Sequence, residues 1–384
     1  MRAVLRLAAL ALLYFAQGLP FGFFSHAVPT LINRDHPPEI AGLSSLLAVP
    51  WGLKFLWAPW IDRVQGTRLG PRRAVIFPLQ LATVVALVAL GMTDVSAERL
   101  APLLVGFVLV SFLSATQDIA ADGLTIDLLA PSERARGGAI QTGAYRAGMI
   151  AGGGGMLWLG ASSIPLFFVR EPAREAPVRA ALTPAISMLG SFAKRHDFRD
   201  IVILLVGFKL GDALAAGMVT RWFVKQGLSM GDIAVTRGLV GGAAAVAGAL
   251  VGAAIAERLG RGRALVLFAA LQTAAIAMYA ALATIATGPL PITWFHVASV
   301  VEHACGGAAT AVLFARMMDL ARDDSRATDY TVQACLLVLV TGAGLVGSGF
   351  IAGRVGLPGL FVVATAVGLF APIVAARQSS RRAG

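Results

Sequence analysis

The chain has 384 residues, of which 57% are hydrophobic and only 14% are charged, and its mean hydropathy is +0.76. Roughly a quarter of the residues of a soluble domain are charged, whereas this chain repeats apolar runs of about 20 residues, long enough to cross a bilayer. These values exclude a soluble globular protein and predict a polytopic membrane protein. The net charge of +11 does not indicate a nucleic-acid partner, because the basic residues lie in short loops between apolar segments.

The first four predicted spans cover about residues 5–31, 40–60, 74–92 and 101–128. The second span carries Lys54 beside Trp57 and Trp60, which favours a lysine that snorkels to the membrane interface. The loop 61–73 contains four arginines, and the loop after the fourth span contains Arg134 and Arg136. Because Lys and Arg are retained on the inner side, these loops predict a cytoplasmic N-terminus.

The fourth span carries two carboxylates on one helical face, Asp118 and Asp122, with Asp127 farther along. Ionisable groups inside a span are costly, and they usually face a water-filled cavity or a partner. Arg146, in the next apolar segment, is the expected counter-charge. We favour a proton or substrate relay, and the alternative is a structural ion network that joins two helices.

The segment available for the fifth and sixth spans, 137–169, is too short for two ordinary crossings. Its 33 residues reach ~50 Å as a helix, whereas two crossings need ~60 Å and a turn. We therefore predict a shortened or missing sixth span. A charged, proline-rich linker follows, with an amphipathic middle at 185–192 that suits a helix on the inner membrane face. The predicted divisions are an N-terminal bundle, a linker and a C-terminal bundle over residues 1–169, 170–200 and 201–384.

The second half repeats the layout of the first, with spans at about 201–224, 233–256, 264–286, 291–320, 331–353 and 357–375. Glu257 lies 195 positions after Asp62 in a similar arginine-bearing loop, and the loops PSERARGGAIQ and ARDDSRATDYTVQ lie about 190 apart. Two similar halves are typical of a transporter built from repeated bundles. The inner-loop charges predicted to control its conformation are Asp62, Arg63, Glu133, Arg134, Glu257 and Arg258.

Two further groups of charges lie within the second half. Lys209 and Asp212 are three apart on one helical face, so they either neutralise each other or leave Lys209 to meet a substrate carboxylate. Glu302 in mid-span is a candidate proton site, and the adjacent His303 is expected to point elsewhere. Glycine-rich stretches, including 241–252 and 342–349, predict close helix packing.

The sequence contains no phosphate-binding loop, nucleophile elbow, metal-ligand cluster or cofactor signature. We therefore expect neither an enzyme nor a bound metal or cofactor. Cys305 and Cys335 lie within apolar segments and are predicted to be small core residues.

Five motifs resemble the AmpG-type permeases of the major facilitator superfamily, a family that also includes acetyl-CoA transporters. They are YFAQGLPFG, KFLWAPWIDR, SATQDIAADGLTIDLL, GAYRAGM and GFKLGDAL. The resemblance implies an all-α fold of two helical bundles with twelve core spans. It also implies proton-driven import of N-acetylglucosaminyl-anhydromuramyl peptides across the bacterial inner membrane. The motif Q-D-x-x-x-D at Gln117, Asp118 and Asp122 then implies proton coupling or substrate binding at these residues.

In the resulting hypothesis, a proton on Asp118 or Asp122 weakens pairing with Arg146, and Arg146 and Lys209 attract an anionic sugar-peptide. The expected partners are this substrate, protons and lipid, and the expected state is a monomer. One alternative keeps the transporter but changes the cargo to acetyl-CoA, a drug or a siderophore-like metabolite, carried in either direction. The other alternative is a truncated homologue that does not transport.

Overall fold

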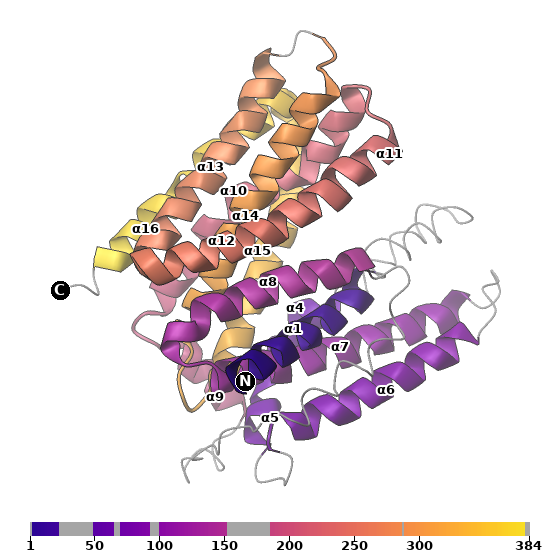
Figure 1. Cartoon of the computed structure of the whole chain (residues 1–384), viewed down its shortest axis with the longest axis vertical. Coiled ribbons are helices and arrows are strands. Elements are labelled where there is room, and N and C mark those ends of the chain that lie inside the picture. Colours follow the sequence, from indigo (N-terminus) through magenta and orange to yellow (C-terminus); the bar gives the residue numbers. More distant parts are fainter. Residues whose placement is uncertain are drawn as a thin grey trace. The chain divides into compact units, whose positions relative to one another are not determined.

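The computed structural model describes residues 2–22, 49–64, 70–92, 100–151, 185–285 and 288–380, and every regular element in these ranges is a helix (Figure 1). In the first half the elements are α1 (Arg2–Gly22), α4 (Val49–Leu53), η3 (Lys54–Leu56), α5 (Ala58–Arg63), α6 (Arg73–Gly91), α7 (Leu100–Leu128), η5 (Pro131–Glu133), α8 (Arg134–Ala151) and α9 (Ala185–Ala193). In the second half they are α10 (Phe198–Lys225), α11 (Met230–Ile233), the π-helix η9 (Ala234–Val240), α12 (Gly241–Leu259), α13 (Arg261–Ile285), α14 (Ile292–Leu320), α15 (Arg326–Gly368) and α16 (Phe370–Ser380). The predicted all-α class is confirmed.

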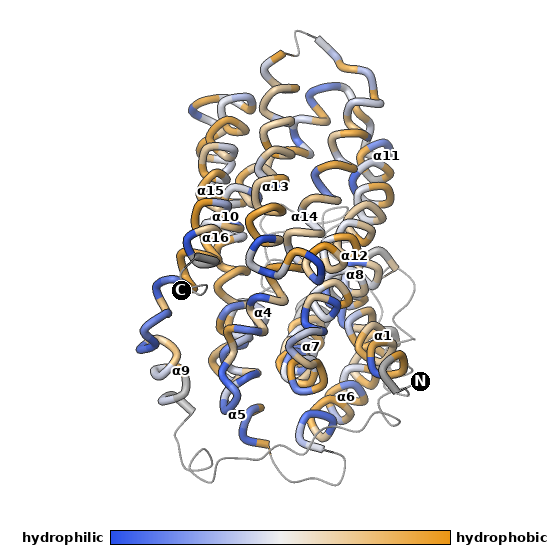
Figure 2. Tube along the Cα trace, turned by 60° about the vertical axis from the view of Figure 1, so that its left-hand side comes forward, coloured by the Kyte–Doolittle hydropathy of each residue, from blue (hydrophilic) through white to orange (hydrophobic). Residues whose placement is uncertain are grey.

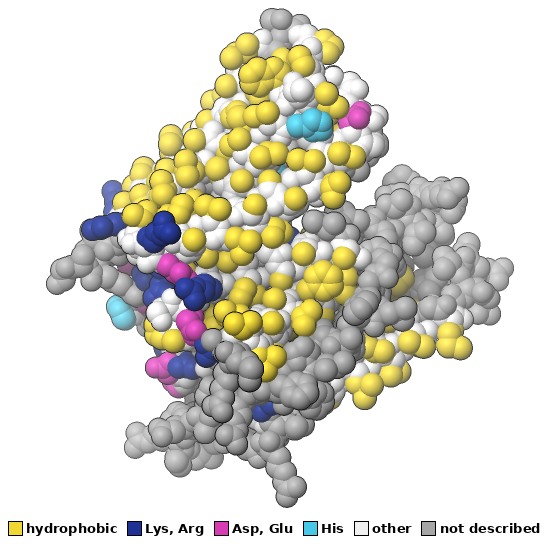
Figure 3. Space-filling model, in the orientation of Figure 1, with side chains coloured by type: hydrophobic (Ala, Val, Ile, Leu, Met, Phe, Trp, Pro, Cys, Tyr) yellow, Lys and Arg dark blue, Asp and Glu magenta, His cyan; other side chains and the backbone are white. Residues whose placement is uncertain are grey.

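Seven helical segments within the described ranges are long and apolar enough to cross a membrane. Figure 2 shows the long helices as mainly hydrophobic, and Figure 3 shows hydrophobic side chains over much of the described surface on one face. Such outward-facing apolar side chains suit contact with lipid. The strongly exposed ones include Leu81, Val105, Leu239, Ile285 and Phe350. The predicted sixth span falls in 152–184, outside the described residues.

One long element, α15, contains the break that the sequence places between its last two predicted spans. Gly356 has φ +73°, a left-handed conformation that side chains with a Cβ rarely adopt, and Pro358 follows it. The 43 residues of α15 are therefore two helices joined at Gly356. A single straight helix of this length would reach ~65 Å, about twice the thickness of the bilayer core.

The chain forms two compact units. Unit 1 comprises Met1–Pro131, Ala144–Lys194 and Met318–Cys335, and unit 2 comprises Ser132–Gly143, Arg195–Met317 and Leu336–Gly384. Helices α8, α14 and α15 thus contribute residues to both units. The predicted bundle boundaries at residues 169 and 201 remain predictions.

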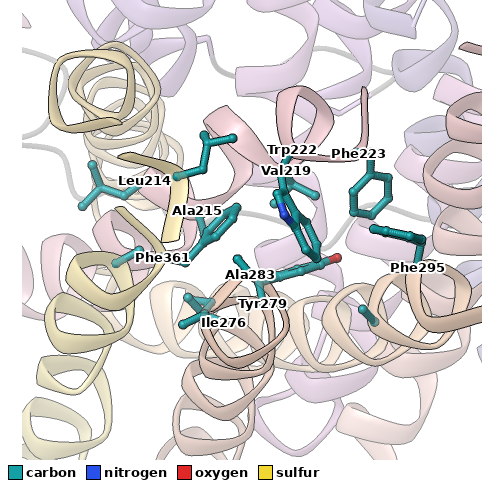
Figure 4. Packing of buried hydrophobic residues seen from close by; sticks show 14 of the residues in the cluster. Leu214, Ala215, Val219, Trp222, Phe223, Ile276, Tyr279, Ala283, Phe295 and Phe361 are labelled. Atoms are coloured by element: carbon teal, nitrogen blue, oxygen red, sulfur yellow. The ribbon is translucent and has the colours of Figure 1, made fainter. Parts of the chain in front are cut away.

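The core of unit 2 is a group of aromatic rings from α10, α13, α14 and α15 (Figure 4). Trp222 lies 5.3 Å from Phe295 and 6.0 Å from Tyr279, measured between ring centroids, and most of the rings meet tilted or edge-on. Edge-on and tilted contacts are favourable because they bring the positive ring edge to the negative ring face. We call this group the aromatic cluster: Trp222, Phe223, Tyr279, Phe295 and Phe361.

Glycines allow helices to approach closely in both units, as predicted. In unit 1 a Cβ added to Gly148 of α8 would lie 2.0 Å from the Phe15 carbonyl oxygen of α1. In unit 2 a Cβ on Gly248 of α12 would lie equally close, 2.0 Å, to the carbonyl oxygen of Ala304 of α14. Backbones at such short range leave no room for any other residue, so these glycines fix the helix pairs.

The linker helix α9 is present within the predicted segment, and it contacts α5. Phe192 is buried, and the Ser191 hydroxyl accepts a hydrogen bond of 3.0 Å from Arg322. Just after α9, Arg195 donates two hydrogen bonds to Asp197, at 2.7 and 2.8 Å, which holds the pKa of that carboxyl below its ordinary value.

We expect Gly148→Ala to destabilise the protein by about 2 kcal/mol, because the new methyl group must push the α1 backbone away. Gly342→Ala is the matched control, since no atom lies within 4 Å of a Cβ at that exposed helical position. Thermal unfolding of the purified variants, followed by tryptophan fluorescence, measures both. Equal unfolding temperatures for the two variants would contradict the close packing of α1 on α8.

Candidate functional site

The first polar group in unit 1 surrounds the two carboxylates of α7. Asp118 and Asp122 lie one helical turn apart and are both buried. Lys54 of η3 is only 3% exposed and forms an ion pair with Asp118, and its Nζ atom also lies 5.4 Å from the centre of the Trp51 ring. The prediction that Lys54 snorkels to an interface is therefore wrong. The side chain stays inside because a buried carboxylate needs a counter-charge.

Tyrosines complete this site. The Tyr14 hydroxyl of α1 donates a hydrogen bond of 2.9 Å to Asp122 Oδ1 and lies 2.9 Å from the Thr125 hydroxyl. Tyr145 of α8 is close enough to interact electrostatically with both carboxylates. We call Tyr14, Lys54, Asp118, Asp122 and Tyr145 the α7 carboxylate site. Neither tyrosine is among the residues predicted for the site, although Tyr14 lies in the motif YFAQGLPFG and Tyr145 in GAYRAGM.

Two glutamines lie on the helices that build the site. Gln17 is three residues after Tyr14 on α1, it is buried, and its amide has no hydrogen-bond partner among the described residues. Gln117 precedes Asp118 on α7 and is also buried. An unsatisfied buried amide costs about 1–3 kcal/mol, which a polar ligand or water would offset. Arg146 lies half-buried on α8, and its role as a counter-charge remains a prediction, while Lys54 forms the ion pair with Asp118.

A second polar group in unit 1 joins the ends of α5, α7 and α15. Arg72, which is fully buried, donates to Asp62 at 2.8 Å and to Asp127 at 3.2 Å. Arg326 donates to the other oxygen of Asp127 at 2.9 Å. Asp62 also accepts hydrogen bonds from the backbone N–H and the hydroxyl of Thr328, at 2.6 and 2.5 Å. We call these five residues the Asp62 network.

The Asp62 network has a clear local cause. The first N–H groups of a helix have no intrahelical acceptor, and Asp62 supplies one for the first turn of α15. Gly123 of α7 makes room for Arg72, because a Cβ there would lie 2.8 Å from the guanidinium carbon. Asp127 therefore belongs to this network and not to the α7 carboxylate site. From the sequence, Arg72 was predicted only to mark the inner side of the membrane, as one of four arginines in the loop 61–73.

Unit 2 contains an ion pair at Glu257, the residue that corresponds to Asp62 in the sequence repeat. Arg136, near the start of α8, donates two hydrogen bonds to Glu257, near the end of α12, at 2.5 and 2.9 Å. Both Asp62 and Glu257 therefore bind the first turns of a helix from the other half of the sequence. The two contacts differ in burial, since the Arg136 side chain is 57% exposed and the Arg72 side chain is fully buried.

The remaining predicted inner-loop charges lie close to these contacts in the chain. Arg63 ends α5, Glu133 ends η5, Arg134 begins α8 and Arg258 lies in the last turn of α12. Their predicted conformational role remains a prediction.

The second-half candidates form pairs within single helices. Lys209 Nζ lies 2.5 Å from Asp212 Oδ2 on α10, so these side chains neutralise each other in this structure. On α14, Nδ1 of His303 lies 2.6 Å from Oε2 of Glu302. The expectation that these neighbours point apart is wrong, because the side chains bend towards each other. Among the described residues no group of three or more His, Cys, Asp or Glu side chains could hold a metal ion.

Comparison with known proteins agrees with this architecture. The chain is 32% identical to the anhydromuropeptide permease of Escherichia coli strain K12 over 359 aligned residues, which cover 86% of this chain and 71% of the permease. It is 23% identical to the putative transporter AmpG 3 of Rickettsia prowazekii, over 86% of this chain and 85% of that protein. Residues 6–178 match a family described as acetyl-coenzyme A transporter 1.

Solved structures show the fold. The Escherichia coli fucose:proton symporter matches with a TM-score of 0.73 at 14% identity, over 98% of each chain. The human organic anion transporter MFSD10 matches with a TM-score of 0.72 at 16% identity, over 96% of this chain and 99% of that one. The predicted major facilitator fold is thus confirmed, as is the prediction of a transporter and not an enzyme. The chain is a multi-pass membrane transporter that belongs to the AmpG-type anhydromuropeptide permease family.

Proposed function

We propose that the protein imports anhydromuropeptides across the bacterial inner membrane together with protons, as a monomer with a cytoplasmic N-terminus. The relative named for this cargo shares 32% identity over most of the chain, and this similarity is the main support. The proton-coupling role rests on the α7 carboxylate site, where two carboxylates are buried one turn apart. Carboxylates in such surroundings are typical proton carriers in transporters.

The coupling step begins at the ion pair between Lys54 and Asp118. A proton on Asp118 removes the negative charge that holds the Lys54 ammonium, so the lysine becomes available to an anionic group of the cargo. Asp122 receives the Tyr14 hydrogen bond and is the second proton acceptor of the site. Protons and cargo then bind in a mutually dependent manner, as symport requires.

A second cargo has its own support, because residues 6–178 match the acetyl-coenzyme A transporter 1 family. Acetyl-CoA carries phosphates and a muropeptide carries carboxylates, so both are anions. The same buried lysine suits either cargo.

The first test is uptake of labelled anhydromuropeptide by a permease-deficient bacterial strain that makes this chain, with membrane insertion confirmed. We expect accumulation that a protonophore abolishes, because the proton gradient drives the cargo inward. Labelled acetyl-CoA, assayed in vesicles of the same strain, is the comparison. Uptake of acetyl-CoA alone would replace the proposed cargo, and accumulation that ignores the protonophore would refute proton coupling.

Separate variants distinguish a proton-coupling role of Asp118 from a purely structural one. We expect Asp118→Asn alone and Lys54→Gln alone each to cost about 3 kcal/mol or more in unfolding free energy, because each leaves the other residue as a buried, unpaired charge. The double variant removes both charges and should recover most of that stability. It should still fail to couple uptake to protons.

Thermal unfolding and protonophore-sensitive uptake are measured on the same preparations of these variants. A double variant with normal, protonophore-sensitive uptake would mean that the pair only holds η3 against α7.

The two contacts that join helix ends should differ in energy. We expect Asp62→Asn to lower the unfolding free energy by about 3 kcal/mol, because Arg72 loses a buried partner. Glu257→Gln, the matched change in the other half, should have little effect, because its partner Arg136 is largely exposed and screened by water. Unfolding at low and high salt measures both variants. Equal losses would contradict the difference in burial.

A further inference from the structure

A polar group in unit 2 lies at the ends of α10, α13 and α14 that are remote from the arginine-bearing loops. It begins at η9, a π-helix inside the continuous segment Gly231–Leu259. π-helical turns inside longer helices are uncommon and occur frequently at functional sites. Here α14 holds the turn, because Ser299 donates a hydrogen bond of 3.0 Å to the Thr236 carbonyl and the Thr236 hydroxyl lies 3.0 Å from His296.

The π-helix carries Arg237 to the edge of the aromatic cluster. Its guanidinium carbon lies 6.0 Å from the centre of the Phe223 ring, a distance at which a cation is attracted to the ring face. Arg237 also interacts electrostatically with Tyr279 of α13. The Tyr279 ring is fully buried beside Trp222, and its hydroxyl points towards the side of the cluster where Phe223 and Phe295 lie (Figure 4).

Arg237 and Tyr279 each have a buried hydrogen-bond donor without a well-placed acceptor among the described residues. Tyr279 and Arg237 lie within reach of a hydrogen bond to each other, but among the described residues no bond of good geometry reaches the Tyr279 hydroxyl or Nη1 of Arg237, although both atoms are buried. Leaving a buried donor unpaired costs about 1–3 kcal/mol, and a charged donor costs more. An acceptor with negative charge would satisfy both donors at once.

The acidic side of the group is on α14. Glu302 interacts electrostatically with Tyr279, and its Oε2 lies 2.6 Å from Nδ1 of His303. That nitrogen also lies 2.9 Å from the Ser299 carbonyl oxygen. Gly241 packs against the imidazole, since a Cβ there would lie 3.0 Å from the ring.

Among the described residues, the titratable groups that face Glu302 are Tyr279 from α13, and His303 and Cys305 from its own helix. Arg237 of η9 interacts with the same tyrosine. Tyr279 and Cys305 are weak acids that stay neutral near neutrality. Arg237 is thus the permanent positive charge of this polar group.

We propose that Arg237 and Tyr279 form a binding site for an anionic group of the cargo, a carboxylate or a phosphate, and that Glu302 takes up a proton when this anion enters. The guanidinium offers planar paired donors and the phenol adds a third, a set that suits both anions. A charged Glu302 repels the incoming anion, so binding of the anion favours the protonated acid. The inference rests on the proposed transport function and adds an anion site in unit 2.

The test is equilibrium binding of two radiolabelled probes, a muropeptide and acetyl-CoA, to the purified full chain in lipid nanodiscs. We expect Arg237→Gln to weaken binding by about tenfold or more, and Tyr279→Phe to weaken it by a smaller factor, because each removes donors to the anion. Arg237→Lys should retain part of the affinity. Arg221→Gln is the matched control, since Arg221 is an exposed arginine on α10.

The proton link is measured with the same probes under mildly acidic and mildly alkaline conditions. We expect the wild type to lose affinity by about tenfold as the pH rises, and Glu302→Gln to lose that dependence while it still binds. Tyr279→Phe removes a single oxygen atom and keeps the test valid if Arg237→Gln does not fold.

The outcomes separate the two proposals. If only acetyl-CoA binds, the proposed cargo is wrong, and the variants test the anion site with acetyl-CoA. If Arg237→Gln and Tyr279→Phe bind the muropeptide with the same affinity as the control Arg221→Gln, the anion site is wrong. The proposed cargo is then still supported. A folded wild-type chain that binds neither anion overturns the site as well. An unchanged pH dependence in Glu302→Gln overturns the role of that acid.

Discussion

A charge that is buried among apolar helices must find a counter-charge or a set of hydrogen bonds, because neither lipid nor a packed side chain can solvate it. Much of what positions the helices of unit 1 follows from this constraint. Lys54 lies inside the protein because Asp118 requires it, and this pair holds η3 against α7. Arg72 is fully buried because Asp62 and Asp127 surround its guanidinium, and these three residues bring the ends of α5 and α7 together.

The same constraint explains why the charged groups are suited to transport. A buried ion pair contributes little net stability, because desolvation of both charges offsets their attraction. Protonation of one partner leaves the other charge buried and unpaired, as its removal by mutation does, so a proton on Asp118 creates a demand for another anion beside Lys54. The exposed contact between Arg136 and Glu257 lacks this property, because water already screens it.

The sequence predicted most of the helices, because long apolar runs specify membrane spans almost independently of tertiary structure. It also identified Asp118, Asp122 and the repeat that relates Asp62 to Glu257, because carboxylates inside apolar runs and similar loops are visible in one dimension. It did not identify the partner of Asp118. A lysine between tryptophans can snorkel or pair, and only the fold brings α7 beside it. Tyr14 was missed for the same reason, since its partner Asp122 lies 108 residues away. Arg72 lies 10 residues from Asp62 and 55 from Asp127, and only the fold brings both carboxylates to its guanidinium.

The error over Glu302 and His303 has another cause. Helical periodicity places adjacent residues 100° apart at the Cα atoms, but long side chains can bend towards each other, and here a carboxylate meets an imidazole. Periodicity therefore predicts which backbone positions share a face better than it predicts which charged atoms meet.

The balance of charges at a site is a better guide to how it could bind an anionic cargo than helical periodicity is. An anion that enters a low-dielectric site together with a proton adds no net charge, which lowers the cost of desolvation. Lys54 and Asp118 place a cation and an acid side by side, and Arg237 and Glu302 both interact with Tyr279. Under the proposed function, each combination allows a proton and an anion to be bound together.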